Sequence, residues 1–292
     1  MTPLVSIIVV CYNHQEFISE CLLSILLQDY PYKEVIVVDN GSTDASLQEI
    51  RRLAKNFDIQ VIENPKNGVH LAFRLGRARA SGKYIVTFSS DDVMAFGRLT
   101  AQVEFLENNL EYAACFGNIL CIDERSNISG QLNRILVKEA DYDFEQVFTK
   151  HVNLYSPTHM YRMSVYDEVG GYDEAFKIED LALYFSILHR GYKFATLNKL
   201  LAYYRIHQNN IHTNYEYMYE NKFRLIENYR EHILYPKALR QFYLEHFSVF
   251  GSYNKIKCIT LLPKVIGFFY NKYFLLGLVR LLFDWRRYAR RM

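Results

Sequence analysis

The stretch Tyr84-Ile-Val-Thr-Phe-Ser-Ser-Asp-Asp92 decides the fold, because an apolar run ends in two adjacent carboxylates. Its first five residues are mostly β-branched or aromatic and are typical of a buried strand. Asp91 and Asp92 repel each other unless a positive charge lies nearby. Ligands collect at the carboxyl ends of strands in open α/β sheets, and Mg²⁺ takes one or two carboxylates beside phosphate oxygens. The alternative is a solvated turn in which Asp92 caps the next helix.

Strand and helix signals alternate around this stretch through the first 125 residues. Continuous apolar runs predict strands over residues 4–11, 34–39, 59–63, 84–88 and 113–122. Helical periodicity between them predicts helices over residues 14–27, 45–56, 69–80 and 97–109. We expect Gly82 to close the third helix as its C-cap. Because β-α-β units with short connections form parallel sheets, the pattern predicts an α/β fold with a mainly parallel, doubly wound sheet.

The rest of the chain is less regular and changes character near residue 210. Before this point lie a strand signal, a helix signal and an extended segment, at residues 159–162, 181–190 and 195–206. Beyond it the sequence is rich in Tyr and helical in pattern, and then basic. We therefore expect one domain over residues 1–210 and a helical, basic and amphipathic region over residues 211–292.

Charge is unevenly distributed, although the 292-residue chain carries a formal net charge of only +2. Residues 251–292 hold nine Lys or Arg against one Asp, a net charge of +8, which leaves −6 for residues 1–250. Apolar residues interleave with these basic ones, as in a helix at an anionic lipid surface. A helical cap packed on the first domain explains the pattern equally well. The acidic body does not favour nucleic-acid binding.

Composition is that of a globular protein in a reducing compartment. Five cysteines show no metal-binding spacing, and the amino terminus shows no secretion signal. Residues 265–283 form the longest apolar candidate, but Asn271, Lys272 and Arg280 interrupt it, which argues against a spanning helix. We expect a cytoplasmic chain. The sequence contains no GxGxxG, GxxxxGK[ST] or GxSxG motif. The chain therefore lacks the usual signatures of dinucleotide-dependent oxidoreductases, P-loop NTPases and α/β-hydrolases.

Polar residues follow the second and third predicted strands. Asp39 ends the second strand, where its carboxylate either accepts hydrogen bonds from a base or ribose, or only shapes a turn. Gly68 follows the third strand in the loop Asn64-Pro-Lys-Asn-Gly68. It would let the backbone approach a ligand closely, although glycine in a loop is more often simple turn chemistry.

Two further groups of polar residues lie in the second half of the chain. Glu179 and Asp180 head an apolar helix, where a carboxylate either acts as a general base or only gains from the helix N-terminus. Arg205 and His207 lie two residues apart on an extended segment, so their side chains share a face. That face could meet phosphate or metal, and the simpler interpretation is a solvent-exposed pair.

Eight short motifs, in this order along residues 4–207, resemble the family 2 glycosyltransferases of bacterial polysaccharide biosynthesis. They are Val5-Ser-Ile-Ile-Val-Val-Cys-Tyr-Asn13, Val37-Val-Asp-Asn-Gly-Ser-Thr-Asp44, Asn67-Gly68, Gly82-Lys-Tyr-Ile85, Ser90-Asp-Asp92, Gly170-Gly-Tyr-Asp173, Glu179-Asp180 and Tyr204-Arg-Ile-His207. Each motif is weak alone, and the ordered set is specific. The resemblance implies an inverting enzyme of the GT-A fold that uses a nucleotide-sugar donor. The helical pattern beyond residue 210 predicts a C-terminal helical extension of that fold.

The resemblance implies that one group of residues binds the nucleotide sugar. Tyr12 and Asn13 lie in the first loop, which faces the nucleotide in such enzymes. Asp39 would bind the uracil or the ribose. Ser90 belongs to the acidic motif, and Arg205 to a segment that closes over the diphosphate.

A second group carries the metal and the reaction. Asp91 matches the last Asp of the family's metal-binding motif, and His207 matches a segment that closes over the diphosphate and metal. Asp92 would support Asp91 or cap the following helix. Asp180 matches the catalytic base, with Glu179 beside it in a supporting role.

The chain departs from the family pattern at two places. Ser89 stands where members often carry the first Asp of Asp-x-Asp-Asp, so one potential ligand is lost and metal use is less secure. Phe73-Arg74 stands where Arg-Asn is common.

The implied reaction is a single in-line displacement. Mg²⁺ or Mn²⁺ on Asp91 neutralises the leaving nucleoside diphosphate, and Asp180 deprotonates the acceptor hydroxyl. The expected donor is a UDP-sugar, and the expected acceptor is a saccharide, carried on a lipid in capsule or O-antigen synthesis. The rival hypothesis is a non-catalytic module that binds a sugar nucleotide or a glycan, with Ser89 as a sign of decay.

Overall fold

The computed structural model describes residues 2–128, 138–207 and 214–284. It forms two compact units. The first contains the described residues of Met1–Phe144, Asn153–Glu174 and Glu179–Asn209, and the second those of Glu145–Val152, Ala175–Ile178 and Asn210–Met292. The expected division into residues 1–210 and 211–292 stays a prediction of domain organisation.

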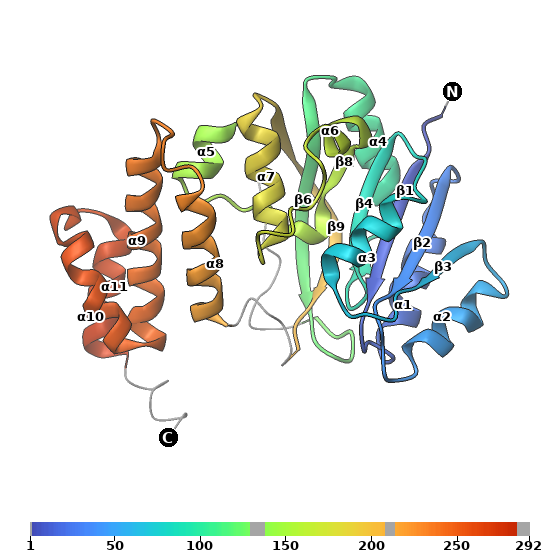
Figure 1. Cartoon of the computed structure of the whole chain (residues 1–292), viewed down its shortest axis with the longest axis horizontal. Helices are drawn as coiled ribbons and strands as arrows, with labels where there is room; N and C mark the ends of the chain where they lie inside the picture. Colours follow the sequence, from blue (N-terminus) through green and yellow to red (C-terminus); the bar gives the residue numbers. More distant parts are fainter. Residues whose placement is uncertain (1, 129–137, 208–213, 285–292) are drawn as a thin grey trace. The chain divides into compact units, whose positions relative to one another are not determined.

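The first unit is built on one mixed sheet with the order β3-β2-β1-β4-β8-β6-β9-β5, and β7 pairs with β9 (Figure 1). Its strands are β1 (Val5–Cys11), β2 (Lys33–Asp39), β3 (Ile59–Glu63), β4 (Tyr84–Ser89), β5 (Val93–Met94), β6 (Tyr112–Ile122), β7 (Ala140–Tyr142), β8 (Met160–Arg162) and β9 (Lys193–Arg205). The pairs β1–β2, β1–β4, β2–β3 and β6–β9 are parallel. The expected α/β fold is confirmed.

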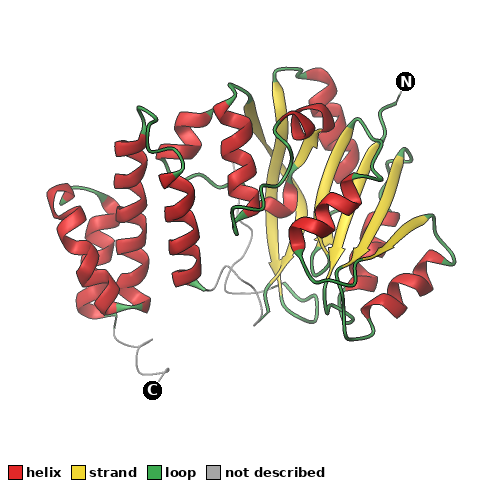
Figure 2. Ribbon diagram, viewed as in Figure 1, coloured by secondary structure: helices red, strands yellow, loops and turns green. Residues whose placement is uncertain are grey.

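Helices cover both faces of this sheet (Figure 2). They are α1 (Ile18–Leu26), α2 (Ser46–Ala54), α3 (Val69–Arg77), α4 (Arg98–Asn108), α6 (Met163–Glu168) and α7 (Glu179–His189). Val5, Ile7 and Val9 of β1 join the apolar cluster that includes residues of α1, α2 and α4. Ile8 faces α3 on the other side. Burial on both faces explains why β1 is a continuous apolar run.

Antiparallel β8 lies between β4 and β6. From the sequence, β4 and β6 are expected to be parallel strands of one doubly wound sheet. β8 has only three residues, too few for a hydrophobic pattern that would predict its position between them. β5 has only two residues and was not expected at all. The sheet is therefore mainly parallel around β1 and mixed beyond β4.

Gly82 is not the C-cap of α3, contrary to expectation. The helix ends at Arg77, five residues earlier, and its C-cap is Ala78. Gly82 N instead donates to Ser6 Oγ at 2.8 Å. A Cβ atom on Gly82 would lie 2.7 Å from Ser6 N and 2.8 Å from Leu4 O, so only glycine permits this approach to β1.

The second unit is helical. It contains α8 (Tyr215–Glu227), α9 (Tyr235–Tyr253), α10 (Lys255–Val265) and α11 (Lys272–Phe283), and most of α5 (Phe144–Thr149) belongs to it. Phe247 and Phe250 of α9 pack with Cys258 of α10 and Phe274 of α11 in its core. Among the described residues, no helix has the length and apolar character that crossing a bilayer requires.

Candidate functional site

Parallel strands bring three loops to one edge of the sheet. Cys11 at the end of β1 is in register with Asp39 at the end of β2, and Val10 is in register with Ser89 at the end of β4. The residues after these strands therefore meet where open α/β sheets bind ligands.

Asp91 and His207 are in direct contact at this edge. Asp91 is 7% exposed, and its Oδ2 lies 2.9 Å from His207 Nε2. Ser89 Oγ donates to Oδ1 of the same carboxylate. Burial alone would raise the pKa of Asp91, but the hydrogen bond with His207 and the charge of His14 outweigh it and hold the pKa below its usual value.

These two residues and His14 form a group able to hold a metal ion. One ligand atom from each of the three lies within 4.8 Å of the other two. Carboxylate oxygen and imidazole nitrogen are both ligands of divalent transition metals. The donor chemistry at this edge thus fits a divalent cation, as the sequence predicts for Asp91 and His207.

Asp92 is not part of this group and instead contacts the end of β9. It is 1% exposed, and its Oδ1 accepts a hydrogen bond from Arg205 N at 2.9 Å. Burial, followed by the charge of Asp91, raises the pKa of Asp92 well above its usual value. The alternative in which Asp92 caps the next helix is wrong, because α4 begins at Arg98 without a side-chain cap.

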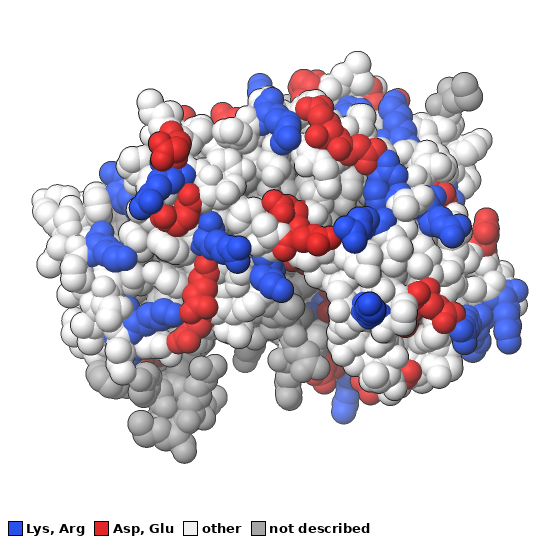
Figure 3. Space-filling view, viewed as in Figure 1, with Lys and Arg blue, Asp and Glu red and all other residues white. Residues whose placement is uncertain are grey.

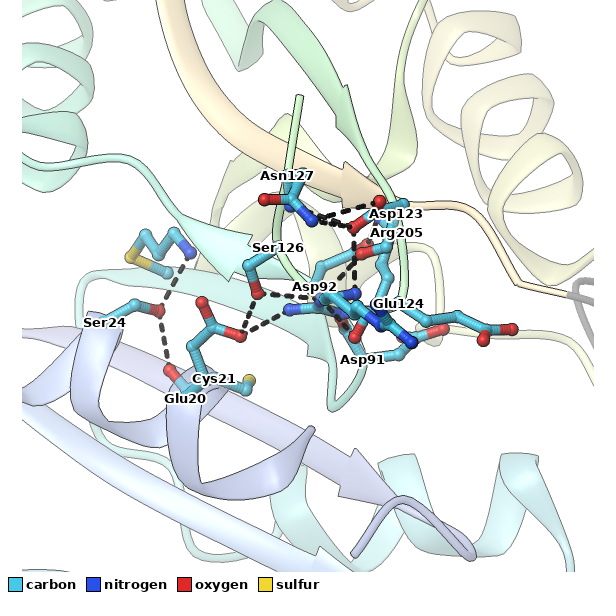
Figure 4. A network of polar contacts seen from close by, with 12 residues as sticks. Glu20, Cys21, Ser24, Asp91, Asp92, Asp123, Glu124, Ser126, Asn127 and Arg205 are labelled. Atoms are coloured by element: carbon cyan, nitrogen blue, oxygen red, sulfur yellow. Dashed lines mark hydrogen bonds and ion pairs between the residues drawn. The ribbon is translucent and has the colours of Figure 1, made fainter. Parts of the chain in front are cut away.

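Arg205 lies within a network of polar contacts that includes Asp91 and Glu20 (Figure 4). Its side chain is 1% exposed. Nε donates to Asp91 O at 2.7 Å, Nη1 to Asp123 O at 2.9 Å, and Nη2 to the Glu20 carboxylate at 2.6 Å. The guanidinium thus connects β9, α1 and two loops, and the expected contact of Arg205 with the diphosphate stays a prediction.

Ser90 of the acidic motif contacts the first loop. It is fully buried, and its Oγ lies 2.8 Å from His14 Nδ1. This contact joins the acidic motif to an imidazole of the first loop, and the expected contact of Ser90 with a sugar nucleotide stays a prediction.

Asp39 is buried, and one of its carboxylate oxygens has no hydrogen-bond partner among the residues that the structure describes. Its Oδ2 accepts a hydrogen bond from Ser42 N at 3.2 Å, while Oδ1 is buried and has no hydrogen-bond partner within the described part of the chain. A buried carboxylate oxygen without a partner is costly, so this atom suits a ligand that donates a hydrogen bond.

The other residues predicted for the nucleotide line the same loops. Tyr12 is 41% exposed. Asn13 has a positive φ of 54°, and its Oδ1 accepts a hydrogen bond from Thr43 N at 2.8 Å. Gly68 is the N-cap of α3 in an extended conformation, and its N donates to Asn40 Oδ1 at 3.0 Å. Asn13 and Gly68 thus help to shape the loops.

Asp180, near the start of α7, ends a chain of hydrogen bonds that begins on β4. Tyr172 OH donates to Asp180 Oδ1 at 2.9 Å and lies 2.7 Å from Thr87 Oγ1. Thr87 Oγ1 lies 2.6 Å from His159 Nε2. Burial raises the pKa of Asp180, and the hydrogen bonds from Tyr172 and Ser156 oppose that rise. Glu179 is the first residue of α7.

Sequence reasoning missed His14, Thr87 and His159, and it gave Tyr172 no role of its own within the motif Gly170-Gly-Tyr-Asp173. His14 directly follows Tyr12-Asn13 in the first loop, so its proximity to the acidic motif was open to inference. Thr87 stands inside a strand and His159 at the edge of another, and neither carries a signal that distinguishes it from a core residue.

Comparison with known proteins identifies the family of the chain. Residues 6–170 match the family described as "Glycosyl transferase family 2". The chain is 30% identical over 220 residues to the uncharacterized glycosyltransferase EpsJ of Bacillus subtilis (strain 168), covering 72% of this chain and 63% of EpsJ. It is 28% identical over 214 residues to the Escherichia coli UDP-Glc:alpha-D-GlcNAc-diphosphoundecaprenol beta-1,3-glucosyltransferase WfaP, covering 72% of this chain and 80% of WfaP.

The fold resembles that of a solved glycosyltransferase. The S. aureus TarS 1–349 structure in complex with UDP-GlcNAc superposes with a TM-score of 0.64 at 18% identity, covering 98% of this chain and 89% of that one. The structure thus has the GT-A fold. The chain spans between 37% and 63% of the length of several curated relatives that it matches. By its match over more than half of its length, the chain belongs to glycosyl transferase family 2.

Proposed function

We propose that the chain is an inverting glycosyltransferase that moves a sugar from a nucleoside diphosphate donor to a hydroxyl of a saccharide. One observation carries the proposal. Asp39 Oδ1, which has no hydrogen-bond partner in the described part of the chain, lies at the end of β2. The contact of Asp91 with His207 lies at the same sheet edge, after β4 and β9. A nucleoside diphosphate offers a hydroxyl or N–H group to Asp39 Oδ1, and its diphosphate, bound to a metal, to Asp91 and His207.

The reaction is a displacement at the anomeric carbon. The acceptor oxygen forms a bond to that carbon from the face opposite the diphosphate, the bond to the diphosphate oxygen breaks, and Asp180 takes the hydroxyl proton. A raised pKa makes Asp180 a stronger base than an exposed carboxylate. A divalent cation held by Asp91 and His207 would supply positive charge beside the leaving diphosphate.

Substitution of Asp180 tests this assignment. We expect Asp180→Asn to lower transfer by about 10²–10⁴-fold, the usual contribution of a general base, with UDP binding retained in calorimetry. Glu174→Gln is the control, because Glu174 forms an ion pair with Arg74 in which both side chains are largely exposed. Full transfer by Asp180→Asn contradicts the assignment. A hydrolysis assay with UDP-, GDP- and dTDP-sugars separates an enzyme from the non-catalytic module, because the module hydrolyses none of these donors.

Relatives support a UDP-sugar donor and a lipid-linked acceptor. The printed name of WfaP specifies UDP-Glc and a diphosphoundecaprenol saccharide, and TarS was solved with UDP-GlcNAc. We therefore place this chain in bacterial cell-surface polysaccharide synthesis, at the inner face of the cytoplasmic membrane.

An exposed apolar face on α11 supports contact with that membrane. Phe274 and Gly277 are buried against neighbouring helices of the second unit, whereas Leu275, Val279 and Leu282 are more than half exposed. Their spacing places these three on one side of the helix. Four arginines of the basic tail, Arg286, Arg287, Arg290 and Arg291, lie outside the described residues.

Nucleic acid is not a proposed partner. On the face drawn in Figure 3, Lys and Arg are interspersed with Asp and Glu instead of forming a basic stripe. A nucleic-acid interface concentrates basic residues on one face.

A further inference from the structure

His14 is placed where a third metal ligand would stand. It follows β1 in the first loop, and one atom of its ring lies within 4.8 Å of a ligand atom of Asp91 and one of His207. The ring centroids of His14 and His207 are 5.9 Å apart, with an interplanar angle of 79°. The imidazoles thus approach the carboxylate from two different segments of the chain.

Ser90 holds this imidazole in position. Its Oγ is buried and lies 2.8 Å from His14 Nδ1, which leaves Nε2 to coordinate a cation. Metal-bound histidines almost always use their second ring nitrogen in such a hydrogen bond, which fixes tautomer and orientation. The backbone is fixed as well, because His14 N donates to Ser46 Oγ at 2.9 Å.

The thiol of Cys11 is not a competing ligand. Cys11 is fully buried at the end of β1, and the group of described residues able to hold a metal ion does not include it.

We propose that His14 completes a three-ligand site with Asp91 and His207, and that this site prefers Mn²⁺ and similar transition metals to Mg²⁺. Mg²⁺ is bound mainly through oxygen, whereas imidazole suits transition metals. Ser89 supplies no carboxylate, so one oxygen and two nitrogens form the protein's share of the coordination shell. The proposal rests on the proposed function, in which a metal ion assists donor binding. It adds His14 as a ligand and a preference among metal ions.

Direct metal binding to the full-length chain tests the proposal. Binding of Mn²⁺ is measured from the loss of the free-ion signal in electron paramagnetic resonance, with Mg²⁺ as competitor and without any sugar donor. We expect His14→Gln to weaken Mn²⁺ binding at least about tenfold and to reduce the preference for Mn²⁺ over Mg²⁺. Ser90→Ala should weaken Mn²⁺ binding by about tenfold, as loss of an orienting hydrogen bond does.

His189→Gln is the matched control, because His189 is exposed at the end of α7, and circular dichroism verifies that each variant folds. Wild-type affinity and selectivity in folded His14→Gln would overturn the proposal, as would absence of Mn²⁺ binding by the wild-type chain. Neither result depends on turnover. A wild-type chain that binds Mn²⁺ through His14 and transfers no sugar would instead contradict the proposed function.

Discussion

Tyr172 connects the proposed base to the central sheet through a single hydroxyl. That hydroxyl donates to Asp180 and contacts Thr87 on β4, and the Tyr172 ring lies 4.5 Å from the ring of Phe73 on α3. The contact with Phe73 does not involve the hydroxyl, so it still holds the ring of residue 172 when the hydroxyl is removed. The polar and packing contributions of Tyr172 are therefore separable by one substitution.

We expect Tyr172→Phe to preserve the fold and shift the pH dependence of transfer. The hydroxyl opposes the rise in the pKa of Asp180, so its removal raises that pKa further. The acidic limb of the pH profile of kcat/KM then moves to higher pH, since the carboxylate must be ionised to act as a base. Loss of a hydrogen bond worth about 1 kcal/mol lowers the rate by roughly fivefold.

A rate profile measured between pH 5 and 9, in this variant and in the wild type, provides the check. Tyr192→Phe serves as the control, because its hydroxyl contacts the exposed Glu168. An unmoved acidic limb would show that Tyr172 does not tune the base.

Some site residues were accessible from sequence and others were not, for a physical reason. Asp39 and Asp91 follow strands that are recognisable by themselves, so their common edge follows from the parallel sheet. The His14–Ser90 contact joins residues 76 apart, and the Thr87–Tyr172 contact joins residues 85 apart. Such pairs depend on how loops close over the sheet, and no local pattern records that.

At the scale of elements, the backbone just before β4 comes close to β1 at Gly82.

The fold class and most of the strands were predictable, since apolar runs and helical periodicity are local signals. The position of β8 was not, because its register with β4 and β6 involves only two residue pairs on each side. The close approach at Gly82 can be tested by placing a larger residue at that position.

Gly82→Ala should destabilise the first unit. The added Cβ would approach the backbone atoms Ser6 N and Leu4 O within 3 Å, and backbone shifts in a packed region cost about 1–3 kcal/mol. Chemical denaturation measures the loss in the free energy of unfolding. Gly267→Ala is a matched control, because its Cβ would meet nothing within 4 Å. Equal stability of the two variants would mean that β1 can withdraw from Gly82 at little cost.

At the scale of the whole molecule, the second unit presents an apolar surface that its own core does not use. Exposed Leu275, Val279 and Leu282 on α11 should insert into the interfacial layer of an anionic bilayer. A variant with all three changed to Gln should lose most of its co-sedimentation with vesicles containing anionic lipid. Leu110→Gln is the control, because Leu110 is 74% exposed and belongs to the first unit.

Vesicles of neutral lipid give a second comparison, because basic residues near a membrane contribute about 1 kcal/mol each only when the surface is anionic. Equal sedimentation of the wild type and the triple variant with anionic vesicles would exclude α11 as the contact.

The contact between Asp91 and His207 has a consequence for the order in which the protein is made. His14, Asp39 and Asp91 are synthesised within the first third of the chain, whereas His207 follows β9, more than a hundred residues later. A nascent chain thus carries two of the three proposed cation ligands, His14 and Asp91, well before the third exists. Once β9 is inserted, an ion held by all three would link early and late segments of the chain and stabilise the folded state by mass action. Metal supply during synthesis would then influence how much protein matures, apart from how fast the mature protein works.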